Sequence, residues 1–503
     1  MNWKSILRFK SLGVVLALAL AVTISPGYVA ATENDFNGGH DYHFGHFVID
    51  PIKTDAGWIS GTMIGDIGKE VRIYRGIPYA APPLGDLRWK PPQPVVPWSG
   101  IRESTKFNLW SPQNFPLTYL GKVLTDADMS EDCLYLNVLT PAKKTTDRLP
   151  VMFWIHGGGL TSYAGTLAAY HLTNLPDHGV VVVTVTHRLG AIGYMAHPEL
   201  TQESPEGVSG NYGQLDLIAA LKWVKKNIAA FGGDPKRVTI FGESGGGSKV
   251  SGLMASPLPK GLFHRAICES GFGGGTPLAT TEQYGVNLMN KVGASSIAEM
   301  RAKSWQEIIL ASVAPGSGYT TSQTVDGWFL QDTIAKTFQA GRQNDVPFII
   351  GMNEGDLASV FNTAVGVVPT ITPPLHSKFY AYLFTHVPSN WKAEGQKAYH
   401  TLELNYIFGD LPSITLRFGG PYVLPTLTDP DPGLGEVDYW LQDAMPTIWA
   451  QFAATGDPSV KGLVRWPAYD YRTDQYLKID VPLEVKTGFS TLQCYSPGGR
   501  ICE

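Results

Sequence analysis

Apolar residues along this chain gather in short runs and in longer periodic stretches. The runs at residues 151–155 (VMFWI) and 180–185 (VVVVTV) are apolar almost throughout and contain several β-branched residues. Strands that are covered on both faces of a parallel sheet have such continuous runs. Both segments are therefore predicted to be central strands of a parallel sheet.

A helical repeat follows further along the chain. Apolar residues recur there every three or four positions, at Leu217, Ala220, Leu221, Val224 and Ile228. The sequence GGDP at 232–235 is expected to end this helix, and another apolar run at 237–241 follows at once. Strand, helix and strand in succession predict an α/β architecture, a mostly parallel sheet with helices on both faces. A further helix is expected around 439–454.

The first residues have the pattern of an export signal. Lys4, Arg8 and Lys10 precede an apolar run at 12–24, and small residues follow at 29–31. The run is too short for a comfortable membrane span, and no other segment is long and apolar enough for one. Residues 1–31 are therefore predicted to be a signal peptide, and the protein to be periplasmic or extracellular. A retained N-terminal anchor is the alternative.

Composition narrows the partners of the mature chain. Charged residues make up only 17% of the 503 residues, and like charges form no run, which argues against a nucleic-acid surface. Removing the predicted signal deletes three positive charges, so the formal net charge goes from −5 to −8. No stable membrane span and no nucleic acid are expected.

Four cysteines and a cluster of three histidines are candidates for disulfide bonds and metal binding. Cys494 and Cys502 flank the turn-forming sequence PGG, so a local disulfide is predicted in the exported protein. Cys133 and Cys268 stand in apolar stretches and are predicted to be buried thiols. His40, His43 and His46 have a spacing that could bind a metal, but a solvated tail is the favoured interpretation and no metal is predicted.

A candidate nucleophile stands at the end of a predicted strand. Ser244 lies in the sequence GESGG at 242–246, which satisfies G-x-S-x-G. A serine on a tight turn from strand to helix needs an unusual backbone angle, and the flanking glycines remove side chains that would clash. The alternative is a glycine-rich turn without chemistry.

A second glycine-rich turn supplies the backbone amides that a serine nucleophile needs. Attack on a carbonyl creates an oxyanion, which backbone amides stabilise. The sequence HGGG at 156–159 follows a predicted strand directly, so Gly158 and Gly159 can present amides, and Gly245 follows the serine. These three residues are the predicted oxyanion hole.

Seven segments carry a family resemblance. They are GIPYAAPPLGDLRW, SEDCLYLNV, MFWIHGGGL, HRLGAIGY, GNYGQLDLIAALKWVKKNIAAFGGDPKRVTIFGESGGG, LFHRAICESG and WAQFAATGDPS. Together they resemble the type B carboxylesterase and lipase family, the cholinesterase-like branch of the α/β hydrolases, over residues 57–470. The resemblance implies an α/β-hydrolase fold, a single catalytic domain at 32–503, and ester hydrolysis through an acyl-enzyme with no cofactor.

Carried over residue by residue, the resemblance implies a triad. Ser244 is the nucleophile and His400, in YHTLELNYIFG, is the base. The acid follows a strand in an Asn-x-Asp-Glu-Gly-like loop, here GMNEGD, which is interpreted as a contracted version with Glu354 as the acid. Asp356 is the alternative acid. Because the base must be neutral, activity is expected to fall on acidification through the histidine pKa, for which the reference is about 6.5.

The resemblance also implies supporting residues. Ser270, in ESG, supports the acid and the histidine without touching substrate, and Arg88 and Glu131 form a structural ion pair.

Two departures from the family pattern stand out. Gly245 replaces the usual Ala after the nucleophile and is expected to loosen the turn. Glu354 and His400 are only 46 positions apart, which predicts a shortened cap region and a more open pocket for small or bulky esters.

Alternative functions share these motifs. An amide-hydrolysing or acyl-transferring enzyme would use the same site, and some relatives are inactive adhesion modules. The intact Ser244, Glu354 and His400 favour an enzyme, a carboxylic ester hydrolase. Oligomeric state and natural substrate do not follow from the sequence.

Overall fold

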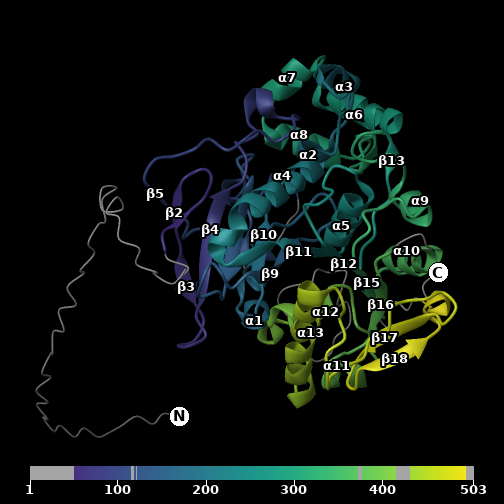
Figure 1. The fold of residues 1–503 in the computed structure, drawn as a ribbon. Coiled ribbons are helices and arrows are strands. Elements are labelled where there is room, and N and C mark those ends of the chain that lie inside the picture. The colour runs from purple at the N-terminus through teal and green to yellow at the C-terminus, as the bar shows by residue number, and fades with distance from the viewer. Residues whose placement is uncertain (1–49, 115–117, 120–121, 372–375, 415–430, 494–503) are drawn as a thin grey trace, which may run out of the picture. The chain divides into compact units, whose positions relative to one another are not determined.

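Eleven strands form the central sheet of the computed structural model, which describes residues 50–114, 118–119, 122–371, 376–414 and 431–493 (Figure 1). In sheet order the strands are β18 (Glu484–Thr487), β17 (Gln475–Ile479), β16 (Phe379–Phe384), β15 (Phe348–Asn353), β12 (Arg265–Glu269), β11 (Gly233–Glu243), β9 (Leu149–Ile155), β10 (Val181–Val185), β8 (Tyr135–Thr140), β4 (Val71–Pro78) and β3 (Thr62–Ile64). Neighbours from β17 through β10 are parallel, and the pairs at both edges are antiparallel. The predicted mostly parallel sheet is confirmed.

The central strands are buried on both faces, as their apolar runs predict. In β9, Val151, Phe153 and Ile155 belong to one hydrophobic cluster, and Met152 and Trp154 belong to the other. Successive side chains of a strand point to opposite faces, so a strand covered on both sides must be apolar at every position.

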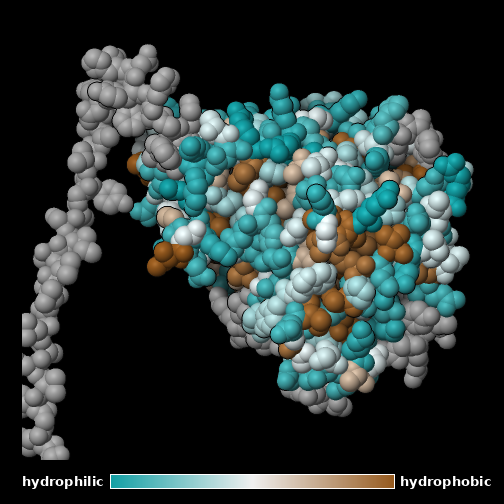
Figure 2. Space-filling view, turned by 60° about the horizontal axis from the view of Figure 1, so that its bottom comes forward, coloured by the Kyte–Doolittle hydropathy of each residue, from teal (hydrophilic) through white to brown (hydrophobic). Residues whose placement is uncertain are grey.

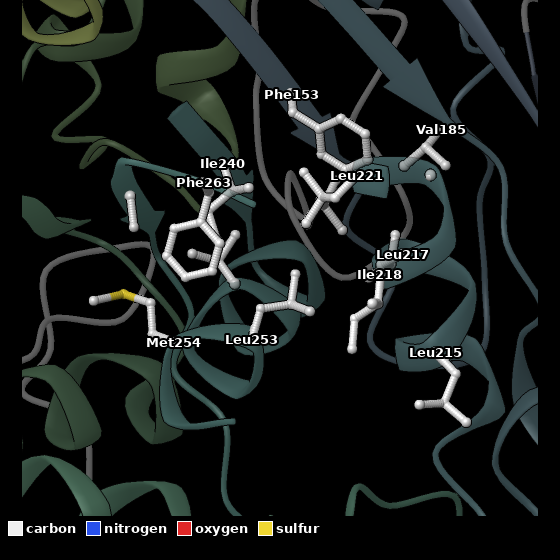
Figure 3. Close-up of a cluster of buried hydrophobic side chains, with 14 of the residues drawn as sticks. Phe153, Val185, Leu215, Leu217, Ile218, Leu221, Ile240, Leu253, Met254 and Phe263 are labelled. Atoms are coloured by element: carbon white, nitrogen blue, oxygen red, sulfur yellow. The ribbon is translucent and has the colours of Figure 1, made fainter. Parts of the chain in front are cut away.

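Helices cover both faces of the sheet. On one face α4 (Tyr212–Asn227) and α5 (Gly245–Ala255) contribute to the first cluster, and Figure 3 shows Leu221 of α4 beside Phe153 of β9. On the other face α12 (Leu402–Phe408) and α13 (Glu436–Thr455) contribute to the second cluster. The remaining helices are α1 (Asn174–Asp177), α2 (Gly190–Tyr194), α3 (Pro198–Glu203), α6 (Leu278–Val292), α7 (Ile297–Ala302), α8 (Trp305–Val313), α9 (Ile334–Gln339), α10 (Ala358–Val367) and α11 (Ser389–Ala393).

Smaller elements complete the described chain. Strands β1 (Ile52–Lys53), β2 (Trp58–Ser60) and β5 (Ile101–Glu103) form a three-stranded sheet. Two further pairs are β13 (Thr276–Pro277) with β14 (Thr324–Val325), and β6 (Thr118–Tyr119) with β7 (Lys122–Val123). On the surface, Figure 2 shows apolar side chains in patches among hydrophilic ones, which is ordinary for protein surfaces.

The predicted helices differ from the structure at their ends. The first periodic stretch begins earlier than expected, at Tyr212, and its last turn, Ile228–Phe231, is a 3-10 helix that ends at Gly232 with φ 78°. The helix expected at 439–454 is α13, which ends at Gly456 with φ 82°. Glycine adopts this left-handed conformation without the penalty of a side chain and so terminates both segments.

Several structural predictions are tested by side-chain contacts. Arg88 and Glu131 form the expected buried ion pair, with Nη2 2.5 Å from Oε2. Cys133 and Cys268 are buried free thiols, as predicted. The predicted signal, the three histidines at 40–46 and the predicted disulfide partners Cys494 and Cys502 lie outside the described residues. Within the described ranges no helix has the length and apolar character needed to cross a membrane.

Candidate active site

Ser244 stands between β11 and α5 with the backbone that a nucleophile turn requires. Its φ of 56° and ψ of −122° lie outside the regions that side chains favour. A Cβ on Gly242 would lie 2.5 Å from the carbonyl oxygen of Ile155, and one on Gly246 would lie 2.0 Å from the same oxygen. Both glycines are needed because β9 passes so close to this turn.

The glycine-rich loop lies directly against this turn. Gly158 and Gly159 have φ values of 81° and 60°, which glycine adopts readily. A Cβ on Gly157 would lie 3.4 Å from Cβ of Ser244, and one on Gly245 would lie 2.1 Å from the carbonyl oxygen of Gly159. The structure therefore brings the predicted oxyanion-hole loop and the serine together.

His400 contacts two carboxylates. Its Nδ1 lies 2.5 Å from Oδ1 of Asp356, and its Nε2 lies 3.2 Å from Oε1 of Glu243, the residue before Ser244. Among the described residues, Ser244 and His400 make no hydrogen bond to each other. Catalytic hydrogen bonds are often long in free enzymes and tighten when substrate binds.

Glu354 does not lie beside His400, which departs from the expectation for the acid. Its Oε1 accepts a hydrogen bond of 2.9 Å from Nζ of Lys397, and its side chain is 23% exposed. Asp356, the alternative acid, has a fully buried side chain that contacts His400. The loop pairs in parallel with the segment before His400, since Gly355 bridges Tyr399 and its amide donates to the carbonyl oxygen of Ala398. Glu354 and Asp356 lie on either side of Gly355, and only Asp356 contacts His400.

A signal for Asp356 was present in the sequence. In the pattern Asn-x-Asp-Glu the acid comes three residues after the asparagine, and counting three from Asn353 leads to Asp356. The interpretation of GMNEGD as a contracted loop pointed instead to Glu354.

Buried carboxylates extend the site beneath the histidine. Ser270 donates a hydrogen bond of 3.3 Å to Oε1 of Glu403, and the side-chain amide of Asn353 donates to its Oε2. Burial, followed by the charge of Asp356, raises the pKa of Glu403 to about 7. Glu269 accepts a hydrogen bond from Nε1 of Trp449 at 2.6 Å, and burial raises its pKa to about 8.

Sequence reasoning missed this cluster. Ser270 supports Glu403, which lies three residues after His400, and does not contact the histidine directly. Glu243 and Glu269 stand at the ends of neighbouring parallel strands, β11 and β12. Since the carboxyl ends of parallel strands meet at one edge of a sheet, their positions next to Ser244 and Ser270 were the available signal.

The carboxylates control the charge on the histidine. Burial disfavours the charged imidazole, but Glu243 and Asp356 outweigh burial and raise the pKa of His400 to about 10. Burial raises the pKa of Glu243, and the positive charge of His400 opposes this rise and favours the charged carboxylate. The groups interact strongly, so they take up and release protons as a set.

This turn, loop and histidine define a class of protein, the serine hydrolases with an α/β-hydrolase fold. The chain belongs to the Carboxylesterase family, whose sequence model matches residues 50–371 and 362–496. Fumonisin B1 esterase of Sphingopyxis macrogoltabida is 33% identical over 471 residues, which cover 82% of this chain and 84% of the relative. Cocaine esterase of Homo sapiens is 31% identical over 522 residues, covering 86% and 88%.

A solved structure of a PNB esterase has the same fold. It superposes with a TM-score of 0.73 at 26% identity, covering 86% of this chain and 96% of its own. The comparisons confirm the family resemblance and the α/β-hydrolase fold. The chain is a carboxylic ester hydrolase.

Proposed function

We propose that Ser244, His400 and Asp356 form the catalytic triad. The observation that carries this proposal is the contact of 2.5 Å between Nδ1 of His400 and the buried carboxylate of Asp356, while Nε2 of the same ring faces Glu243, the residue before Ser244. Asp356 fixes the tautomer of the imidazole and stabilises its positive charge during catalysis. This role replaces the one expected for Glu354.

The reaction has two halves. Nε2 of His400 removes the proton of the Ser244 hydroxyl as Oγ attacks the ester carbonyl, and the imidazolium then protonates the departing alcohol. In the second half, His400 removes a proton from water, the water oxygen attacks the acyl-enzyme, and the proton returns to Ser244 as the carboxylic acid leaves. These steps use only side chains, backbone amides and water, so they require no cofactor.

Backbone amides stabilise the oxyanion in both halves. The proposed donors are the amides of Gly158, Gly159 and Gly245, and the close approach of the loop to the first turn of α5 supports this assignment. Removing one such donor costs about 10² to 10³ in kcat in a well-studied serine protease.

A short segment between acid and base favours an open pocket. Asp356 and His400 are 44 positions apart, and the described elements between them are α10, a 3-10 turn, β16 and α11. We propose that the site accepts bulky as well as small acyl groups. Two relatives, named Fumonisin B1 esterase and Cocaine esterase, are named for different substrates, so likeness alone selects none.

A panel of p-nitrophenyl esters with growing acyl chains tests the function. Wild-type protein should turn over several members, and Ser244→Ala should reduce turnover to the blank. Turnover by Ser244→Ala equal to that of wild type would contradict the proposal. A sharp preference for the smallest acyl group would count against the open pocket.

Two further measurements separate the alternatives. Faster turnover of matched p-nitroanilides than of esters would favour an amide hydrolase. Failure of a fluorophosphonate to label wild-type protein would favour an inactive relative.

Export and a local disulfide are part of the same proposal. Lys4, Arg8 and Lys10 before the apolar run support removal of residues 1–31. N-terminal sequencing of protein from the periplasm or medium should begin at Thr32, and a chain that retains Met1 would contradict this.

Mass spectrometry without reduction should show Cys494 linked to Cys502, and two free thiols there would contradict the disulfide.

A further inference from the structure

Lys249 is a buried amine that contacts the oxyanion loop, and burial lowers its pKa to about 7. It lies on α5, five residues after Ser244, and is fully buried. Its Nζ donates a hydrogen bond of 3.0 Å to the carbonyl oxygen of His156, the residue that opens the glycine loop. In the described part of the chain, no carboxylate forms an ion pair with Lys249.

The surroundings of Lys249 offer little compensation for its charge. The nearby imidazoles of His156 and His187 are buried and stacked, with ring centroids 5.0 Å apart. Burial first, and then the positive charge of Lys249, lower the pKa of both histidines well below the ordinary value. Their Nδ1 atoms contact backbone carbonyl oxygens, so neither histidine supplies negative charge.

Lys249 shares one face of α5 with the glycines that carry the loop. A Cβ on Gly245 would lie 2.1 Å from the carbonyl oxygen of Gly159, and one on Gly246 would lie 3.1 Å from the carbonyl oxygen of His156. Residues three or four positions apart lie on the same side of a helix, so Lys249 reaches the same loop one turn later. The loop therefore packs directly against the backbone of Gly245 and Gly246, and the side chain of Lys249 donates a hydrogen bond to it.

We propose that Lys249 is a positioning residue that holds the oxyanion loop against α5 through the carbonyl oxygen of His156, so that Gly158 and Gly159 keep their amides aimed at the oxyanion. This inference rests on the proposed oxyanion hole. The amine of Lys249 donates to this carbonyl oxygen whether or not it carries its extra proton, and the protonated form makes the stronger hydrogen bond. Burying an amine without a charged partner costs stability, so the presence of Lys249 beside the oxyanion loop points to function.

The lost hydrogen bond and the relieved burial of the amine should act in opposite directions on the turnover and the stability of Lys249→Met. Methionine has a similar length and no polar group, so the variant loses the hydrogen bond to His156 and also the cost of burying an amine. The melting temperature should equal or exceed that of wild type. Turnover should nevertheless fall, because a displacement of about 1 Å at a catalytic group can cost about 10² in rate.

Kinetics per active site test the proposal. Fluorophosphonate titration counts reactive serines, after which kcat and KM are measured per site, together with inhibition by a trifluoromethyl ketone that mimics the tetrahedral intermediate. Lys249→Met should lower kcat about tenfold or more, leave KM within about twofold, and weaken the ketone by the same factor as kcat. Lys222→Met, at an exposed position on α4, is the matched control and should behave as wild type.

Two results would overturn the role of Lys249. One is a kcat per titrated site within about twofold of wild type, and the other is a loss explained by fewer titrated sites. Lys249→Gln provides a second variant should the first fail to fold, with the same fall in kcat expected and an unchanged kcat overturning the proposal. Turnover by Ser244→Ala equal to that of wild type would contradict the triad, whereas normal turnover in Lys249→Met would contradict only the role of Lys249.

Discussion

The imidazole Nδ1 of His400 lies 2.5 Å from Oδ1 of Asp356, a carboxylate that is fully buried. The opposite nitrogen of the same ring faces Glu243 at 3.2 Å. A histidine between two carboxylates holds its proton more tightly than a free histidine does. The base of this enzyme therefore becomes available at higher pH than an isolated imidazole would.

The fall of kcat/KM on acidification should have its midpoint above pH 6.5. The base acts only when neutral, and Glu243 and Asp356 overcome the effect of burial and raise the pKa of His400 to about 10. As pH falls through the raised pKa, His400 becomes protonated and kcat/KM declines. The direction agrees with the expectation from sequence, but the midpoint moves above the reference of about 6.5.

Glu243→Gln should move the midpoint of this fall in kcat/KM to lower pH. The reason is that one of the two carboxylates in contact with His400 loses its charge. The midpoint of kcat/KM against pH measures the shift in the free enzyme. Glu206→Gln, at an exposed position, is the control and should leave the midpoint in place. Identical midpoints for Glu243→Gln and wild type would show that Glu243 does not control the base.

Glu269→Gln should stabilise the protein more at pH 8 than at pH 5. Burial raises the pKa of Glu269 from 4.5 to about 8, so the folded state keeps a proton that the unfolded state loses. Stability contributed by this group is present below pH 4.5 and is lost as pH rises toward 8. Glutamine retains an oxygen for Trp449 and removes this loss, which is on the order of a few kcal/mol.

Thermal melting of both proteins at pH 5 and pH 8 measures the effect of Glu269→Gln. The difference in melting temperature should be small at pH 5 and positive at pH 8. An equal difference at both pH values would show that the pKa of Glu269 is not raised.

Gly245→Ala should lower kcat, although Ala is the usual family residue at this position. A Cβ there would lie 2.1 Å from the carbonyl oxygen of Gly159, so the oxyanion loop must move away. We expect a loss of about tenfold to a hundredfold in kcat. Gly366→Ala in α10, where a Cβ would meet nothing within 4 Å, is the control, and equal kcat for both variants would refute the close approach.

Local features of the fold and site could be predicted from sequence. The run at 151–155 is buried on both faces and became β9, and Ser244 stands where strand and helix meet. These features depend on neighbouring residues, because continuous apolar runs determine buried strands and flanking glycines permit the turn.

Features set by distant parts of the chain could not be predicted in the same way. Gly245 was expected to loosen the turn, yet its missing side chain admits Gly159 from a loop far away in sequence. Glu354 pairs with Lys397, 43 positions along, and only the path of the loop past Ala398 directs Asp356 to the histidine. Both outcomes depend on tertiary packing.

Comparing Asp356→Asn with Glu354→Gln tests the central claim, that Asp356 orients the catalytic histidine, most directly. Both changes neutralise one carboxylate in the same loop, and fluorophosphonate titration corrects for the fraction of folded protein. Asp356→Asn should lower kcat by about 10⁴, the scale seen when a triad histidine loses its orienting carboxylate. Glu354→Gln should stay within a few-fold of wild type, because its partner is Lys397 at a partly exposed position. The reverse ranking, with Glu354→Gln inactive and Asp356→Asn active, would contradict the account.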